Sequence, residues 1–114
     1  MEIFSIFGGG ADNERIDAEA LSGLINAKEK FTLVDVRTPK ETREGVIPGA
    51  KLVPLNVIES SGAPKFEGKV VLYCASGMRS VAARKALKRQ GVQDVVDLKG
   101  GINAWILSGG KVSK

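Results

Sequence analysis

The chain has 114 residues, of which 43% are hydrophobic and 26% are charged, so we expect one domain whose core needs no disulfide or metal. The single cysteine and the absence of histidine exclude an intramolecular disulfide, a Cys/His metal site and a histidine general base. The net charge of +4 comes with few aromatic residues and no recognisable nucleic-acid-binding motif, so we expect no nucleic-acid partner.

The N-terminal segment is apolar over residues 1–7, but it lacks the basic leading region of a signal peptide and runs into three glycines. It is also too short to span a membrane. We therefore expect a cytoplasmic protein with an N-terminal arm at 1–14, one domain at 15–110 and a C-terminal tail at 111–114. A docking role for the apolar arm is the alternative interpretation.

The first predicted elements have clear boundaries. Asp17 is a good N-cap, and the leucines after it recur at helical spacing, which predicts a helix over about 18–27. Residues 31–36 form an apolar run typical of a strand. The next four residues, 38–41, combine a capping box with proline at the first helical position, which predicts a short helix over about 39–44.

The remaining elements also alternate between strands and helices. They are predicted as a short strand at 51–53, a helical turn and loop over 55–67, a strand at 70–73, a helix that ends near Gln90, a strand at 94–98, and a final turn or helix that carries Trp105. This order argues for an α/β fold with a mainly parallel sheet.

The predicted helix that ends near Gln90 has two different sides. Small alanines on one side allow close packing against a sheet, whereas the other side is assigned four basic residues, Arg84, Lys85, Lys88 and Arg89. We interpret this basic stripe as a solvated face, with a patch that binds a partner as the alternative.

Cys74 stands where the apolar run 70–73 gives way to a polar turn and then a helix. Backbone N–H groups at a helix start are unpaired, and together with the guanidinium of Arg79 they favour an anion. Such surroundings lower the pKa of a thiol and make it the reactive thiolate. A cysteine that only fills the core needs neither Gly77 three residues later nor an arginine five residues later. We therefore predict that Cys74 is a nucleophile.

The charge is spread unevenly along the chain. Residues 1–57 hold 7 basic and 9 acidic side chains, whereas residues 58–114 hold 10 basic and 4 acidic ones. The half that contains Cys74 is therefore positive, which suits the steering of a small anionic substrate toward the thiol.

Asp35 also stands at the end of a predicted strand. Because ligand sites of open α/β sheets lie beyond the carboxyl ends of the strands, Asp35 and Cys74 are expected near one crevice. We expect Asp35 to orient the active loop and Arg37 to form a structural salt bridge with Glu41 or Glu44, with catalytic roles as the alternative.

Four stretches of the chain, between about Phe31 and Trp105, resemble the rhodanese family of sulfurtransferases. They are similar to the family's strand-to-helix entry (LVDVRTP, 33–39), its Gly-His-Ile-Pro-Gly-Ala turn (EGVIPGA, 44–50), its strand and active-site loop (VVLYCASGMRS, 70–80) and its closing Gly-Gly-x-x-Ala-Trp motif (GGINAW, 100–105). Val46 stands where the family usually has histidine, and Thr42 where an aromatic residue is common. Both departures concern packing and the turn more than sulfur chemistry.

The resemblance implies a rhodanese-like α/β fold with a mainly parallel central sheet of about five strands flanked by helices. It also implies an enzyme of the thiosulfate sulfurtransferase type. Cys74 would take the outer sulfur of thiosulfate or a small-molecule persulfide, become a persulfide, and pass the sulfur to cyanide or a thiol. We expect a monomer without cofactor or metal.

The same resemblance implies a substrate cradle made of Ala75, Ser76, Gly77, Met78, Arg79 and Ser80, with Asp35 and Arg37 in support. Arg79 would bind the anionic end of the donor and stabilise the leaving group. The hydroxyls of Ser76 and Ser80 would add hydrogen-bond donors, although a local bond within the helix is an equal alternative for Ser80.

Two other functions stay open at this point. Phosphatases and arsenate reductases of the same fold are one alternative, but the phosphatase loop is one residue longer than the four residues between Cys74 and Arg79. A carrier or interaction module is the other, in which the persulfide serves one protein acceptor and turnover of thiosulfate is incidental.

Overall fold

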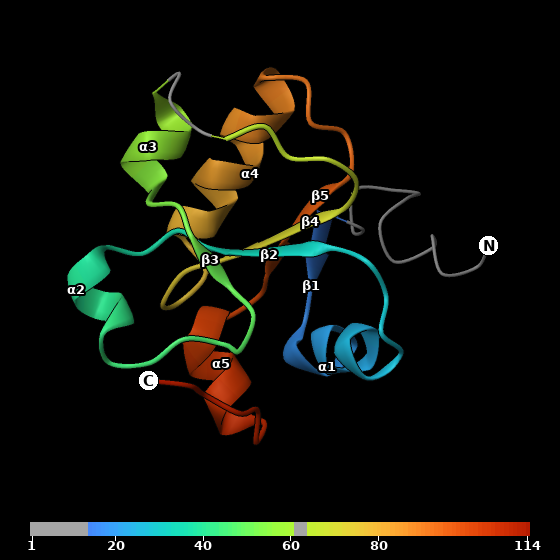
Figure 1. The fold of residues 1–114 in the computed structure, drawn as a ribbon, viewed down its shortest axis with the longest axis vertical. Coiled ribbons are helices and arrows are strands. Elements are labelled where there is room, and N and C mark those ends of the chain that lie inside the picture. The colour runs from blue at the N-terminus through green and yellow to red at the C-terminus, as the bar shows by residue number, and fades with distance from the viewer. Residues whose placement is uncertain (1–13, 61–63) are drawn as a thin grey trace.

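The computed structural model describes residues 14–60 and 64–114. Strands and short helices alternate along them (Figure 1): β1 (Arg15–Ile16), α1 (Ala18–Asn26), β2 (Thr32–Asp35), α2 (Pro39–Thr42), β3 (Lys51–Leu52), α3 (Leu55–Glu59), β4 (Val70–Tyr73), α4 (Arg79–Arg89), β5 (Val95–Leu98) and α5 (Gly101–Leu107). The predicted alternation is confirmed, with two differences. The two-residue strand β1 was not predicted, and α2 ends at Thr42 rather than at 44.

The five strands form one sheet in the order β1-β5-β4-β2-β3, and the pairings between these strands are parallel. Figure 1 shows α1 and α5 on one side of the sheet and α3 and α4 on the other. The structure therefore confirms the predicted α/β fold, a parallel sheet of five strands flanked by helices.

Two apolar cores lie on the two faces of the sheet. Successive side chains of β4 point alternately into one core and the other. Val71 and Tyr73 join the core beneath α1 and α5, whereas Val70 and Leu72 join the core beneath α3 and α4. Cys74 comes next in this alternation and belongs to the second core. The strand thus delivers the sulfur to the α4 side, at the carboxyl end of the central strand.

Helix starts follow the capping rules. The Asp17 carboxylate accepts a 2.8 Å hydrogen bond from the N–H of Ala20, and Thr38 and Glu41 form a reciprocal capping box at α2. Capping by nearby side chains explains why these two boundaries were readable from the sequence.

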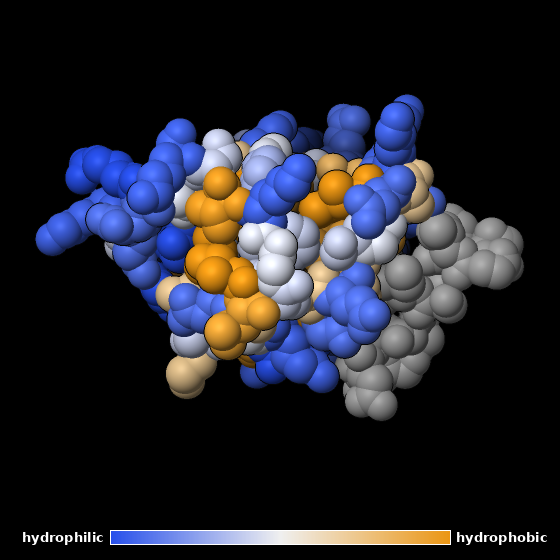
Figure 2. Space-filling model, turned by 90° about the horizontal axis from the view of Figure 1, so that it is seen from below, coloured by the Kyte–Doolittle hydropathy of each residue, from blue (hydrophilic) through white to orange (hydrophobic). Residues whose placement is uncertain are grey.

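The surface over α1 and α5 carries hydrophobic side chains among charged ones (Figure 2), including Ile25, Ile106 and Leu107. None of the helices in the described part of the chain is long and apolar enough to span a membrane. The predicted N-terminal arm lies outside the described residues except for Glu14.

Candidate active site

Cys74 follows β4 directly, and its side chain is almost completely buried, with 1% exposed. The chain then turns through Gly77 into α4, which begins at Arg79. Gly77 has a φ of +104°, a conformation that residues with a side chain rarely adopt. A Cβ at this position would also approach the backbone nitrogen of Gly100 to 3.0 Å. Glycine is therefore required where the loop folds back over the sulfur.

Three groups of the loop face the sulfur of Cys74. The N–H of Gly77 donates to Sγ at 3.1 Å and the N–H of Ser80 at 3.4 Å, while Ser80 Oγ lies 3.6 Å from Sγ. Burial alone would raise the pKa of the thiol. Hydrogen bonds from the Ser80 hydroxyl and from the N–H groups of Ser80, Gly77 and Arg79 outweigh it, so the pKa of Cys74 is lowered from its ordinary value.

The start of α5 fixes the loop from the other side. The N–H groups of Ile102 and Asn103 donate to the carbonyl oxygens of Cys74 and Ala75, at 2.9 and 3.1 Å. Gly101 has a φ of +62°, and a Cβ there would collide with the same two carbonyl oxygens. The glycine that begins α5 therefore allows a helix start to bond directly to the backbone that carries the nucleophile.

The other loop residues are arranged differently from Gly77 and Ser80. Ser76 is exposed, and within the described residues no hydrogen bond joins it to the sulfur. The side chain of Met78 is 80% exposed. The structure therefore gathers Gly77, Ser80 and the backbone of Arg79 around the sulfur, and turns Ser76 and Met78 toward solvent.

The side chain of Arg79 is paired with Glu41, a partner that sequence reasoning did not assign to the site. Arg79 Nη1 and Nη2 donate to Glu41 Oε1 and Oε2 at 2.7 and 2.8 Å. These bonds lower the pKa of Glu41 to about 2 and raise the pKa of Arg79. The capping box had marked Glu41 as a helix-start residue, but nothing in the sequence indicated a contact with residue 79.

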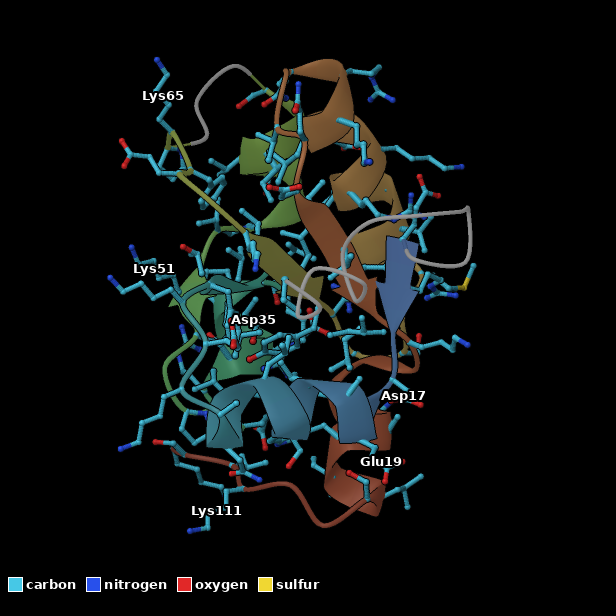
Figure 3. All side chains as sticks on the ribbon, turned by 90° about the vertical axis from the view of Figure 1, so that its right-hand side faces the viewer. Asp17, Glu19, Asp35, Lys51, Lys65 and Lys111 are labelled. Atoms are coloured by element: carbon cyan, nitrogen blue, oxygen red, sulfur yellow. The ribbon has the colours of Figure 1, made fainter. Side chains whose placement is uncertain are left out.

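Asp35 and Arg37 pair with each other, so the expected bridge from Arg37 to Glu41 or Glu44 was wrong. Nε and Nη2 of Arg37 donate to the Asp35 carboxylate at 2.6–3.1 Å, and Nη2 also donates to the carbonyl of Gly45 at 2.7 Å. Figure 3 shows Asp35 in the interior, whereas the labelled lysines extend outward. The reason is desolvation: a buried guanidinium needs the nearest buried carboxylate.

Asp35 and Arg37 also do not touch the cradle. Among the described residues, neither forms a hydrogen bond with residues 75–80. Their carboxylate and guanidinium are instead used within the segment that joins β2 to the 44–50 turn. The sequence led us to expect that Asp35 orients the active loop directly. Its carboxylate accepts hydrogen bonds from Arg37 instead.

The carbonyl of Gly77 is held by a residue that sequence reasoning missed. Nη2 of Arg15, in β1, donates to this oxygen at 3.0 Å, and Nε of the same guanidinium donates to Asp97 at 2.9 Å. Asp97 lies in β5 with none of its surface exposed. The first strand of the sheet thus reaches the loop that carries Cys74.

Asp97 also binds Arg84, so the prediction that Arg84 belongs to the exposed basic stripe was wrong. Arg84 is only 7% exposed, and its Nε donates to Asp97 Oδ1 at 2.8 Å while Nη1 pairs with Glu14 at 3.0 Å. It therefore does not belong to the solvated face with Lys85, Lys88 and Arg89. A carboxylate inside the apolar run VVDL was the available signal, because a buried Asp requires a cationic partner.

Comparisons with known proteins agree with this geometry. The Rhodanese-like domain family matches residues 17–108. A sulfurtransferase from Allochromatium vinosum is 44% identical over 96 residues, covering 82% of this chain and 89% of that protein. The thiosulfate sulfurtransferase GlpE from Pseudoalteromonas translucida is 33% identical over 79 residues, covering 68% and 75%.

A solved structure extends the agreement to the fold. The rhodanese-related protein from Thermoplasma volcanium superposes with a TM-score of 0.76 at 34% identity, covering 88% of this chain and 97% of that one. Together with the relatives named as sulfurtransferases, this supports sulfur transfer as the general activity. The chain belongs to the rhodanese-like domain family.

Proposed function

We propose that the protein moves a sulfane sulfur from thiosulfate or a small-molecule persulfide, through a persulfide on Cys74, to cyanide or a thiol. The observation that carries this proposal is the arrangement around Sγ: the N–H groups of Gly77 and Ser80 donate to it, and the Ser80 hydroxyl lies 3.6 Å away. Such a cradle stabilises an anionic sulfur before and after transfer, because its dipoles are already oriented.

In the first step, the thiolate of Cys74 attacks the outer sulfur of the donor. With thiosulfate, a new S–S bond forms to Cys74, the old S–S bond breaks, and sulfite leaves with the electron pair. The Cys74 persulfide then carries the negative charge on its terminal sulfur. Arg79 meets the anionic end of the donor in this proposal, after its guanidinium exchanges Glu41 for the donor.

In the second step, the acceptor attacks the terminal sulfur of the persulfide. Cyanide forms a carbon–sulfur bond and leaves as thiocyanate, while the S–S bond breaks and its electron pair returns to Cys74 as thiolate. Because Sγ is anionic at the beginning and at the end, the same N–H groups serve both steps.

The test is intact-protein mass spectrometry after incubation with thiosulfate, followed by cyanide. We expect a gain of one sulfur, about 32 Da, that cyanide removes, and no gain on the Cys74→Ser variant. The absence of any gain with thiosulfate and with glutathione persulfide would exclude the proposal. Hydrolysis of an aryl phosphate that is lost in Cys74→Ser would instead favour the phosphatase alternative.

A protein acceptor is the second candidate. Exposed side chains beside the nucleophile and on α4 support it. Met78 is 80% exposed beside the buried nucleophile, and Lys85, Lys88 and Arg89 are exposed on the helix that follows. Reversal of the three charges should then leave cyanide turnover unchanged and weaken sulfur transfer to the acceptor protein. Arg84 is left out of this variant because it is buried. Unchanged transfer to the protein would count against this candidate.

A further inference from the structure

The guanidinium of Arg79, to which the proposed function assigns the anionic end of the donor, is already paired with a carboxylate. Both Nη atoms of Arg79 donate to both oxygens of Glu41, at 2.7 and 2.8 Å. The two side chains are 37% and 34% exposed, so the pair lies at the rim of the loop, where solvent and solutes reach it. A ligand that binds Arg79 through these atoms must displace Glu41.

Glu41 is also fixed from its own side. Its Oε1 accepts from the N–H and the hydroxyl of Thr38, at 3.0 and 3.1 Å, and its own N–H donates to Thr38 Oγ1 at 3.2 Å. These bonds hold the carboxylate at the start of α2 whether or not Arg79 is present. The negative charge therefore stays beside the loop when Arg79 turns to a ligand.

The ion pair weakens the attraction that Arg79 alone would offer to a small dianion. Bonding to Arg79 lowers the pKa of Glu41 to about 2, so the carboxylate is charged throughout the neutral range. The charge of the arginine is compensated by a partner less than 3 Å away. Thiosulfate, with two negative charges beside its sulfane sulfur, meets the fixed carboxylate as well as the arginine.

The other side chain at the rim is apolar. Met78 immediately precedes Arg79 and is 80% exposed. Its flexible thioether suits contact with the organic part of a larger donor rather than with a hydrated inorganic anion.

We propose that Glu41 is a specificity-determining residue, which competes with dianionic donors for Arg79 and biases the site toward donors with less charge and an organic group next to the sulfane sulfur. An organic persulfide is such a donor: Cys74 thiolate takes the terminal sulfur of R–S–SH, and R–S⁻ leaves. This inference rests on the proposed function and names the donor class within it.

The experiment compares two donors of matched chemistry in wild type and Glu41→Gln. Thiosulfate carries two charges and releases sulfite, whereas benzenethiosulfonate carries one charge and an aromatic ring and releases benzenesulfinate. Glutamine can keep the capping box through its Oε1, while it removes the charge and the second acceptor that Arg79 Nη2 uses. We expect the KM for thiosulfate to fall about threefold to tenfold in Glu41→Gln, while the KM for benzenethiosulfonate changes by less than about twofold.

The matched control is Glu44→Gln, which removes the same charge three residues later from an exposed side chain outside the pair. This variant should change either KM by less than about twofold, because a screened distant charge acts weakly. An unchanged or higher KM for thiosulfate in Glu41→Gln overturns the inference, since Glu41 would then only orient Arg79. Failure of both donors to load sulfur on Cys74, read by mass, would overturn the proposed function as well.

Discussion

The Arg37–Asp35 and Arg79–Glu41 pairs differ in how far water reaches them. The side chains of Arg37 and Asp35 are 6% and 1% exposed, whereas those of Arg79 and Glu41 are 37% and 34% exposed. A buried guanidinium cannot exchange its partner for water, so Asp35 is obligatory for Arg37. Arg79 and Glu41, each about one third exposed, can separate at low free-energy cost. This leaves Arg79 available to a ligand. Burial therefore separates a structural pair from the pair that we propose takes part in binding.

The largest difference should appear when each pair loses its carboxylate. Asp35→Ala leaves the Arg37 charge buried without a partner and should reduce the free energy of unfolding by about 3–5 kcal/mol. Urea unfolding followed by circular dichroism measures this loss. Glu44→Ala, an exposed carboxylate, is the control and should stay within about 0.5 kcal/mol of wild type. A loss below about 1 kcal/mol for Asp35→Ala would contradict the structural role.

The geometry of the buried pair can be tested without removing its charge. Arg37→Lys keeps the cation but replaces the fork that reaches both Asp35 oxygens and the carbonyl of Gly45 with a single ammonium. We expect a loss of roughly 1–3 kcal/mol in the same unfolding measurement. Wild-type stability in this variant would mean that charge alone, and not the bidentate contact, holds the 44–50 turn.

The exposed pair should contribute far less to stability. A double-mutant cycle with Glu41→Ala and Arg79→Ala isolates the interaction from the capping role of Glu41, and we expect a coupling of about 0.2–1 kcal/mol. Thermal or urea unfolding of the four proteins supplies the data. A coupling above about 2 kcal/mol would place this pair in the same class as the buried one.

The smallest effect is the pH dependence of the exposed pair. Hydrogen bonds from Arg79 lower the pKa of Glu41 from 4.5 to about 2, so folding favours the ionised carboxylate. The resulting stability is complete above the unfolded-state pKa and is lost as the pH falls through the folded-state pKa. The stability difference between wild type and Glu41→Gln, below about 1 kcal/mol, should therefore shrink between pH 5 and pH 2. A difference that grows toward acid pH would contradict the assigned direction.

Local signals predicted the part of the site nearest to Cys74. The apolar run of β4, the glycine at 77 and the helix after it lie within a few residues of the sulfur, and their turn and strand preferences agree with one another. The caps at Asp17 and Thr38 are equally local. The parallel sheet followed from the alternation of such elements.

The partners of the arginines could not be predicted in the same way. Arg84 shares its helix with the exposed basic residues Lys85, Lys88 and Arg89, and its burial is explained by its bonds to Asp97, thirteen residues later in β5, and to Glu14. Arg15 belongs to a strand of two residues, too short to show a period. Glu41 meets Arg79 because α2 lies beside the loop, which depends on the whole sheet order.

The Arg15–Gly77 bond joins residues that are 62 positions apart, and the bonds of Ile102 and Asn103 hold the same loop from α5, the last helix of the chain. Contacts over such separations form late in folding, because a long stretch of chain must close first. In a chain where β1 or α5 has not yet docked, the loop that carries Cys74 lacks these hydrogen bonds. We therefore expect the rate at which the thiol reacts with an alkylating agent to report whether folding is complete, without an engineered probe residue.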